Sequence, residues 1–233
     1  MEPAVLEQFH AADPPEAFRI QNQLRHRCIV HRMIDTGEIR HVGGADAAYS
    51  SDRIYAAAVV MTFPNLDLVD SACIVQEIRF PYIPGLLSFR EGPAIVLACC
   101  RLYTPPDVMF INGHGYAHPR RFGLASHIGV VLDIPTIGIA QRLLVGAADM
   151  PGPESGSAVP VIDNNEITGM AVRTVEGKKP VFVSAGHKVD LAQAVGLVLR
   201  TAMRHRLTEP IWHADRLARE CRNNRFITGT IRD

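Results

Sequence analysis

The chain has 233 residues, of which 47% are hydrophobic and 21% are charged. This composition is typical of a soluble globular protein and excludes a disordered chain or a coiled coil. Lys plus Arg and Asp plus Glu both total 24. The zero net charge excludes an overtly basic, histone-like nucleic-acid binder but leaves room for a local basic patch. Only three of the 24 cations are lysines. Arginine suits bidentate phosphate contacts, although GC-rich coding produces the same bias.

The cysteines and the N-terminal segment bear on the compartment. There are five cysteines and no C-x-x-C motif, which predicts reduced thiols rather than disulfides or a zinc site: Cys28, Cys73, Cys99, Cys100 and Cys221. The first residues lack a basic segment followed by an apolar one, so no secretory signal is expected. The best apolar run, 54–63, is about half the length that spans a bilayer. We therefore expect a cytoplasmic protein without membrane association.

The first half of the chain shows one helical segment and three strand-like segments. Apolar residues at four-residue spacing predict a helix over 15–33. Turn-prone residues separate the strands, which predicts an antiparallel meander. The strands are expected over 42–50, 55–63 and 71–80. A helix over 88–103 follows, and Ser88 and Glu91 have the spacing of a capping box at its start.

Helices and strands then alternate. The expected elements are a strand over 107–111, a helix over 121–132, a strand over 135–140, strands near 168–174 and 180–184, a helix over 189–206 and a short helix over 212–222. Residues 146–158 have loop composition and are short enough to be an insertion in one domain spanning 1–233. This order predicts an α/β fold of the ribonuclease-H-like kind. Such a fold is a mixed sheet, with an antiparallel meander plus parallel strands and flanking helices.

Asp46 is the first candidate for chemistry. It lies in an expected strand, 42–50, whose other residues are mostly apolar or small. Burying a lone carboxylate is expensive, so this side chain must be paired, solvated in a cleft or bound to a metal. The small neighbours would let a ligand or a backbone approach closely. The alternative is an aspartate that caps a turn at the end of the strand.

The segment 80–91 is the most unusual stretch. Pro81 and Pro84 flank Tyr82 and Ile83, which stiffens the loop and would hold the tyrosine outward. A rigid hydrophobic wedge of this kind can enter a base stack. The alternative is a proline-rich loop whose tyrosine packs on the core.

A glycine-spaced turn follows the strand expected over 107–111. It contains His114 and His118, followed by Arg120 and Arg121, which could bind phosphates. Open α/β sheets bind ligands beyond the carboxyl ends of their strands. Two histidines at this spacing are a weak zinc signal, because the intervening glycines oppose helical geometry. Gln141, beyond another strand, and Asp215, in the last helix, are each ordinary surface residues when taken singly.

Together these segments resemble the endonuclease V family of the ribonuclease-H-like superfamily. The resemblance is strongest over roughly 40–145 and rests on blocks in family order. They are Gly44-Ala45-Asp46-x-x-Tyr49, Pro81 to Glu91, Gly113-His114-Gly115-x-Ala117-His118-Pro119-Arg120, 122–127 and 135–138. Beyond 145 it is weaker, and lies mainly in 169–173, 187–200 and 209–215.

The resemblance implies a DNA repair endonuclease. Its members recognise hypoxanthine, the product of adenine deamination, and cut the second phosphodiester 3′ to the lesion; some act on inosine in RNA. It also implies a catalytic centre that binds Mg²⁺ (or Mn²⁺). Asp46, Glu91 and Asn112 would be the metal ligands, with the Asp215 and Gln141 positions completing the centre.

The resemblance further implies how the nucleic acid is held. The wedge would be Tyr82 with Ile83 and Pro84, filling the gap left by a flipped-out base. The base pocket would be formed by Gly85, Leu87, Gly113, His118 and Gly138. Phosphate contacts are expected from Arg90, Arg120 and Arg121.

Two departures from the family pattern fall in the expected centre. The family usually has Asp at the position of Asn112 and Lys at the position of Gln141, so two charged groups are replaced by neutral amides. Three functions therefore stay open. They are a working metal-dependent endonuclease, a binding protein for inosine-containing DNA or RNA with impaired cleavage, and a ribonuclease-H-like nuclease with another substrate. No interaction motif for a protein partner is present.

Overall fold

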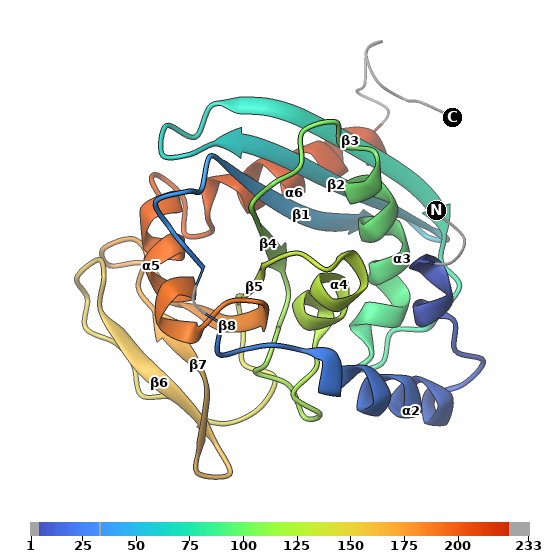
Figure 1. Ribbon diagram of the computed structural model, residues 1–233, viewed down its shortest axis with the longest axis horizontal. Coiled ribbons are helices and arrows are strands. Elements are labelled where there is room, and N and C mark those ends of the chain that lie inside the picture. The colour runs from blue at the N-terminus through green and yellow to red at the C-terminus, as the bar shows by residue number, and fades with distance from the viewer. Residues whose placement is uncertain (1–4, 33, 224–233) are drawn as a thin grey trace.

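A computed structural model describes residues 5–32 and 34–223. Its centre is one eight-stranded mixed sheet (Figure 1), with strand order β3-β2-β1-β4-β5-β8-β7-β6. The strands are β1 (His41–Tyr49), β2 (Arg53–Thr62), β3 (Leu68–Glu77), β4 (Val108–Asn112), β5 (Thr136–Ala140), β6 (Ala158–Asp163), β7 (Glu166–Val172) and β8 (Val181–His187). The predicted fold class, a mixed sheet with flanking helices, is confirmed.

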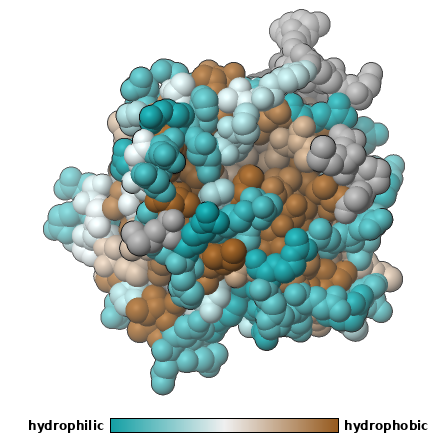
Figure 2. All heavy atoms as spheres, viewed as in Figure 1, coloured by the Kyte–Doolittle hydropathy of each residue, from teal (hydrophilic) through white to brown (hydrophobic). Residues whose placement is uncertain are grey.

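Helices cover both faces of the sheet. They are α2 (Pro14–Leu24), α3 (Leu87–Cys100), α4 (Leu124–Leu132), α5 (Leu191–Thr201) and α6 (Glu209–Arg222), with 3₁₀ turns η1 (Glu7–Phe9) and η2 (Arg25–Arg27). One core layer joins the sheet to α3 and α4, and the other joins it to α5 and α6. Figure 2 shows apolar side chains gathered over α3 and α4 on the face in view.

The strand register brings chemistry-bearing residues together. The β1–β2–β3 meander is antiparallel, as predicted, whereas β1, β4 and β5 run parallel. Ala45 of β1 lies opposite Ile111 of β4, so Asp46 lies beside Asn112. Asn112 lies opposite Ile139. Because side chains alternate along a strand, Gln141 follows on the same face of the sheet.

Several predicted element boundaries differ from the structure by three residues, and two predicted helices end five or more residues too late. The helix expected over 15–33 ends at Leu24 and is followed only by η2. Beyond it the chain is tied to the end of β8, since the Cys28 thiol donates to the Gly186 carbonyl and the Ile29 N–H donates to His187 Nδ1. The helix expected over 189–206 ends at Thr201.

A hairpin occupies a region where one strand was expected. The strand β6 was not predicted, because Pro160 and flanking polar residues weaken its pattern. It pairs with β7 across a turn in which Asn164 and Asn165 have positive φ. Arg173, which follows β7, fastens the loop before β6. It donates to the carbonyls of Pro151 and Gly152 in that loop and to the carbonyl of Lys178 after β7.

One contact between cysteines was not expected. The sulfur atoms of Cys73 in β3 and Cys221 in α6 lie next to each other although the two residues are 148 positions apart in the chain. Their proximity depends on how α6 packs across the meander, which cysteine spacing does not reveal. Among the described residues, no helix is long and apolar enough to cross a membrane.

Candidate active site

Two buried carboxyl groups form the heart of the site. Asp46 is 6% exposed and Glu91 is 8% exposed. One Asp46 oxygen accepts the N–H of Ala47 at 2.8 Å, and the other accepts the side-chain amide of Asn112 at 2.8 Å. Glu91 accepts the hydroxyl of Tyr49. We call Asp46, Glu91, Asn112 and Asp215 the carboxylate centre.

The electrostatics of the centre are unfavourable for two negative charges. Burial raises the pKa of Asp46 to about 7 and that of Glu91 to about 8, and the charge of Asp46 adds to the rise at Glu91. The hydrogen bonds from Asn112 and Tyr49, and to a smaller degree the charges of Arg219 and Arg90, lower these pKa values. Among the described residues, no ion pair joins either carboxylate to a lysine or arginine. The pair therefore favours a bound proton or a bound cation.

The helix α6 brings a third carboxylate close. Asp215 pairs with Arg219 one turn further on at 2.8 Å, and its charge raises the pKa of Asp46. The helix can approach because β1 has Gly44, where an added Cβ would lie 2.2 Å from the Pro210 backbone. The small residues of β1 thus admit a helix backbone, one of the two roles foreseen for them.

Gln141 lies at the edge of this region with an unforeseen partner. Its side-chain oxygen accepts a hydrogen bond from Arg206 at 2.7 Å. Arg206 comes from the segment between α5 and α6, and its own backbone carbonyl accepts the hydroxyl of the buried Thr174. A cation therefore stands beside the amide that replaces the expected lysine.

Within the described part of the chain, no three His, Cys, Asp or Glu side chains lie close enough together to form a metal site. The two buried carboxyls nevertheless have the donor chemistry that a hard divalent cation requires. Asp46 and Glu91 supply carboxylate oxygens, which Mg²⁺ prefers. Their burial and mutual repulsion would be relieved by a positive charge. Asn112 fits less well in the observed rotamer, because its amide nitrogen faces Asp46. Only its other atom, Oδ1, could serve as a ligand.

A cavity of about 250 Å³ lies at the start of α3. This is below the usual 300–1,000 Å³ of small-molecule sites and suits a single flat group. Its walls are formed by Gln21, Tyr82, Ile83, Pro84, Gly85, Leu87, Ser88, His114, His118, Gly123, Leu124, Arg142, Leu143 and Leu144. Of the expected base pocket, Gly85, Leu87 and His118 lie in this wall. We call it the base cavity, after the role that the resemblance implies for these three residues.

A saturated hydrogen-bond network supports the base cavity. The carbonyl of Gly85 accepts from Gln21 at 3.1 Å, from His118 at 2.9 Å and from Arg120 at 2.8 Å. His118 Nδ1 accepts the N–H of Arg120, so both ring nitrogens are used and the ring is neutral. Burial, followed by the nearby Arg120 charge, lowers the pKa of His118 to about 3. His118 therefore shapes the wall and has no ring nitrogen left for a ligand.

Gln21 is a member of this network that the sequence analysis missed. Its side chain is fully buried, and it also donates to the Phe122 carbonyl at 3.2 Å and accepts from Arg120 at 2.6 Å. The signal was available, because Gln21 occupies a core position between Ala17 and Leu24 on the buried face of α2. A polar side chain at such a position needs internal partners.

Two glycines expected in the base pocket lie outside the cavity wall. An added Cβ on Gly138 would lie 2.4 Å from the backbone nitrogen of Gly115, and one on Gly113 would lie 3.0 Å from the Leu124 side chain. Both positions are thus closely packed against neighbouring chain segments.

The three expected phosphate-binding arginines already have protein partners. Arg90 donates to the Phe80 carbonyl at 2.8 Å, and Arg120 is turned into the network around Gly85. Arg121 pairs with Asp163 at 2.8 Å and Glu166 at 2.7 Å. These carboxylates belong to the β6–β7 hairpin, whose first strand was not predicted, so the pairing could not be foreseen.

For the segment 80–91, the structure agrees with an outward-facing tyrosine and contradicts the predicted capping box. Tyr82 is 68% exposed, so it does not pack on the core. The predicted capping box is wrong, because α3 begins at Leu87 with Leu86 as its N-cap and no side chain caps it. Glu91 is bound by Tyr49 instead.

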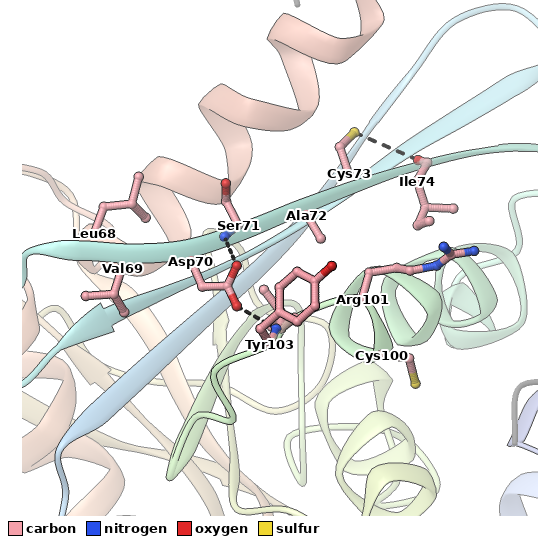
Figure 3. A pocket seen from close by; sticks show the side chains of 11 residues that line it. Leu68, Val69, Asp70, Ser71, Ala72, Cys73, Ile74, Cys100, Arg101 and Tyr103 are labelled. Atoms are coloured by element: carbon pink, nitrogen blue, oxygen red, sulfur yellow. Dashed lines mark hydrogen bonds between the residues drawn. The ribbon is translucent and has the colours of Figure 1, made fainter. Parts of the chain in front are cut away.

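A larger hollow of about 590 Å³ lies along β3 and the end of α3 (Figure 3). Its one carboxylate, Asp70, accepts the backbone N–H groups of Ser71, Tyr103 and Thr104. These bonds fasten the loop after α3 to β3. None of the residues singled out from the sequence as site residues lines this hollow.

Comparisons with known proteins identify the family of this chain. The profile of the Endonuclease V family matches residues 22–216. Endonuclease V of Roseiflexus sp. strain RS-1 is 46% identical over 203 residues, covering 87% of this chain and 90% of that protein. The crystal structure of endonuclease V from Streptomyces avermitilis aligns with a TM-score of 0.88 and 41% identity, covering 93% of this chain and 96% of that one.

A further solved structure contains nucleic acid. Endonuclease V of Ciona intestinalis, in complex with a 24mer DNA containing an inosine followed by a ribo-adenosine, aligns with a TM-score of 0.77 and 28% identity. The alignment covers 90% of this chain and 98% of that one. Fold and matches together define a nuclease of the mixed α/β class. The chain belongs to the endonuclease V family, so the resemblance predicted from its motifs is confirmed.

Proposed function

We propose that the protein is a DNA repair endonuclease that recognises deoxyinosine and hydrolyses the second phosphodiester 3′ to the lesion. The observation that carries this proposal is the dual role of α3. Leu87 and Ser88 in its first turn line the base cavity, and Glu91 one turn later belongs to the carboxylate centre. One turn of helix advances about 5.4 Å. A base held in the cavity thus places its flanking backbone near the centre.

Asp46 and Glu91 would hold Mg²⁺, with Asn112 Oδ1 and Asp215 as the further oxygen donors. The metal, when bound, would supply an activated water and stabilise the leaving oxygen. Tyr49 fixes the Glu91 carboxylate through its hydroxyl. The exposed Tyr82 would stack in the gap left by the extruded nucleotide. The inosine-containing DNA bound by the Ciona relative supports the substrate class.

A second function has one observation in its favour. Asn112 donates its amide hydrogen to an Asp46 oxygen that a metal would need, and the position expected to be lysine is the neutral Gln141. This arrangement favours a protein that binds inosine-containing DNA or RNA but cleaves it slowly, or cleaves it only at a high concentration of divalent cation.

The deciding experiment measures nicking and binding on one oligonucleotide duplex containing a single inosine. Mg²⁺ and Mn²⁺ are titrated with the native chain, with Asn112→Asp and with Asn112→Asp/Gln141→Lys. A working endonuclease nicks at the second bond 3′ to inosine, and the substitutions add little. An impaired one binds inosine in a gel shift and gains nicking, at lower metal concentration, with each substitution.

Substrate controls complete the test. Uracil, abasic and undamaged duplexes and an inosine-containing RNA are compared in the same assay. Preferential binding to one of these over inosine DNA, or nicking at a bond other than the second 3′ to inosine, contradicts the proposed substrate and cleavage position.

A further inference from the structure

Ser88 has a buried hydroxyl group that the fold leaves unused. The residue is 1% exposed and lines the base cavity. Within the described part of the chain, its Oγ has no hydrogen-bond partner. A buried hydroxyl without a partner destabilises a fold, and native proteins rarely keep one without a reason.

The other buried polar side chains of the cavity wall are fully engaged. Gln21 bonds to Gly85, Phe122 and Arg120, and His118 uses both ring nitrogens. Among the three buried polar side chains of the described wall, only Ser88 therefore has hydrogen-bonding capacity left for a ligand.

The position of Ser88 on α3 indicates what kind of atom it would meet. It is the second residue of a 14-residue helix whose N-terminus has no side-chain cap. The N–H groups at such a helix start point toward a ligand, and the helix dipole favours negative partial charge there. The hydroxyl and these N–H groups together favour an acceptor atom such as a carbonyl oxygen.

We propose that the Ser88 hydroxyl donates a hydrogen bond to the 6-oxo group of the extruded purine. This assignment rests on the proposed function and makes Ser88 a specificity-determining residue. Deamination of adenine replaces an amino donor at C6 by an oxo acceptor. An amino group at this place would face the donors of the helix start, so the contact favours hypoxanthine over adenine.

The test compares dissociation constants of the native chain and Ser88→Ala. The probes are duplexes containing inosine, adenosine or nebularine, a purine nucleoside without a group at C6, measured with Ca²⁺ in place of Mg²⁺. The native chain should prefer inosine. Ser88→Ala should weaken inosine binding roughly three- to tenfold and leave nebularine binding unchanged. The same substitution should raise the Tm, because it removes an unsatisfied buried hydroxyl.

Ser126→Ala is the matched control, since Ser126 is a buried serine on α4 that lies outside the cavity wall. Its inosine affinity should equal that of the native chain. Two results overturn the Ser88 assignment but leave the proposed function standing, provided that the native chain prefers inosine. In the first, Ser88→Ala binds inosine as tightly as the native chain does. In the second, Ser88→Ala loses affinity for inosine and for nebularine to the same extent. If the native chain does not distinguish inosine from adenosine, the proposed function and the assignment fail together.

Discussion

The base cavity and the carboxylate centre adjoin along α3 but are built on opposite principles. In the wall of the cavity, protein groups satisfy one another. The Gly85 carbonyl has three donors, and His118 is held neutral with both nitrogens bonded. In the centre, Asp46 and Glu91 are buried on neutral donors, with a third carboxylate nearby. Except for the Ser88 hydroxyl, the described polar groups of the cavity wall are satisfied without a ligand, whereas a positive charge would stabilise the two buried carboxyls of the centre.

This difference teaches how recognition and cleavage are divided. A saturated network keeps its shape whatever is bound, so the cavity is preorganised. A pair of buried carboxyls changes its state with protons and cations. Substitutions in the cavity should therefore alter binding and stability, and substitutions in the centre should alter the rate of cleavage.

The largest effect is expected from Glu91→Gln. The amide keeps the shape of the side chain and can still accept the Tyr49 hydroxyl, but it removes a charge that would hold the metal. Single-turnover nicking of the inosine duplex should fall on the order of 10³-fold, with inosine affinity within about twofold of native. Glu77→Gln, an exposed glutamate on β3, is the control. If Glu91→Gln loses affinity and cleavage rate to the same extent, recognition and cleavage are not divided between the two regions.

A smaller effect on stability, with no effect on the rate, is expected from Gln21→Leu. The substitution removes the bonds of Gln21 to Gly85, Phe122 and Arg120. Urea unfolding should show a loss of about 2–3 kcal/mol, since buried partners are left unsatisfied. Inosine affinity should fall, whereas nicking at saturating protein should not. Gln23→Leu, two residues along on the exposed side of α2, should change neither quantity. A loss of nicking rate in Gln21→Leu would show that the base cavity also affects cleavage in the carboxylate centre, which contradicts the proposed division.

The pH dependence of stability should reveal the centre without any substrate. The folded-state pKa values of Asp46 and Glu91 are raised to about 7 and 8, so their contribution is present below about pH 4 and is lost as the pH rises through 7 and 8. Burial also lowers the pKa values of five described histidines, to about 3 for His118 and His127. Their contribution has the opposite sign and fades over about one pH unit above 6.5. The difference between the native chain and a variant without both carboxyls therefore isolates the carboxyl contribution between pH 6.5 and 8.5.

In this window the metal-free chain should lose about 1–2 kcal/mol of unfolding free energy. Urea titrations in EDTA at both pH values measure the loss. Asp46→Asn/Glu91→Gln should flatten the profile, and Mg²⁺ should restore stability only in the native chain. Equal pH profiles in the native chain and in Asp46→Asn/Glu91→Gln would show that these carboxyls do not titrate as a buried pair.

The fold was predictable where the pattern was local. Alternation along β1 and β2 and turn residues between them predicted the meander. A single polar residue inside an apolar strand made Asp46 a candidate for the site. The β1–β4 register then places Asn112 beside it. The exposed Tyr82 followed from flanking prolines that stiffen its loop.

Prediction failed where one residue's partner depends on distant packing. Arg121 pairs with a hairpin more than 40 residues further along the chain. Cys73 meets Cys221 only through the placement of α6. Ser88 and Glu91 have the spacing of a capping box, but Tyr49 from β1 binds the glutamate. Local sequence rules describe a helix start in isolation. They fail when a residue from elsewhere in the fold supplies a competing hydrogen-bond partner.

The smallest predicted effect concerns Tyr82, which lines the cavity mouth but belongs to neither network. Tyr82→Ala should weaken inosine-duplex binding about tenfold, since stacking on a base contributes about 1–3 kcal/mol. Tyr82→Phe should keep most of the affinity, because the ring supplies the contact. Tyr103→Ala alters a similarly exposed tyrosine beside the hollow along β3 and should leave binding unchanged. If Tyr82→Ala instead lowers the nicking rate at saturating protein, the wedge positions the backbone in the carboxylate centre as well as holding the base out of the stack.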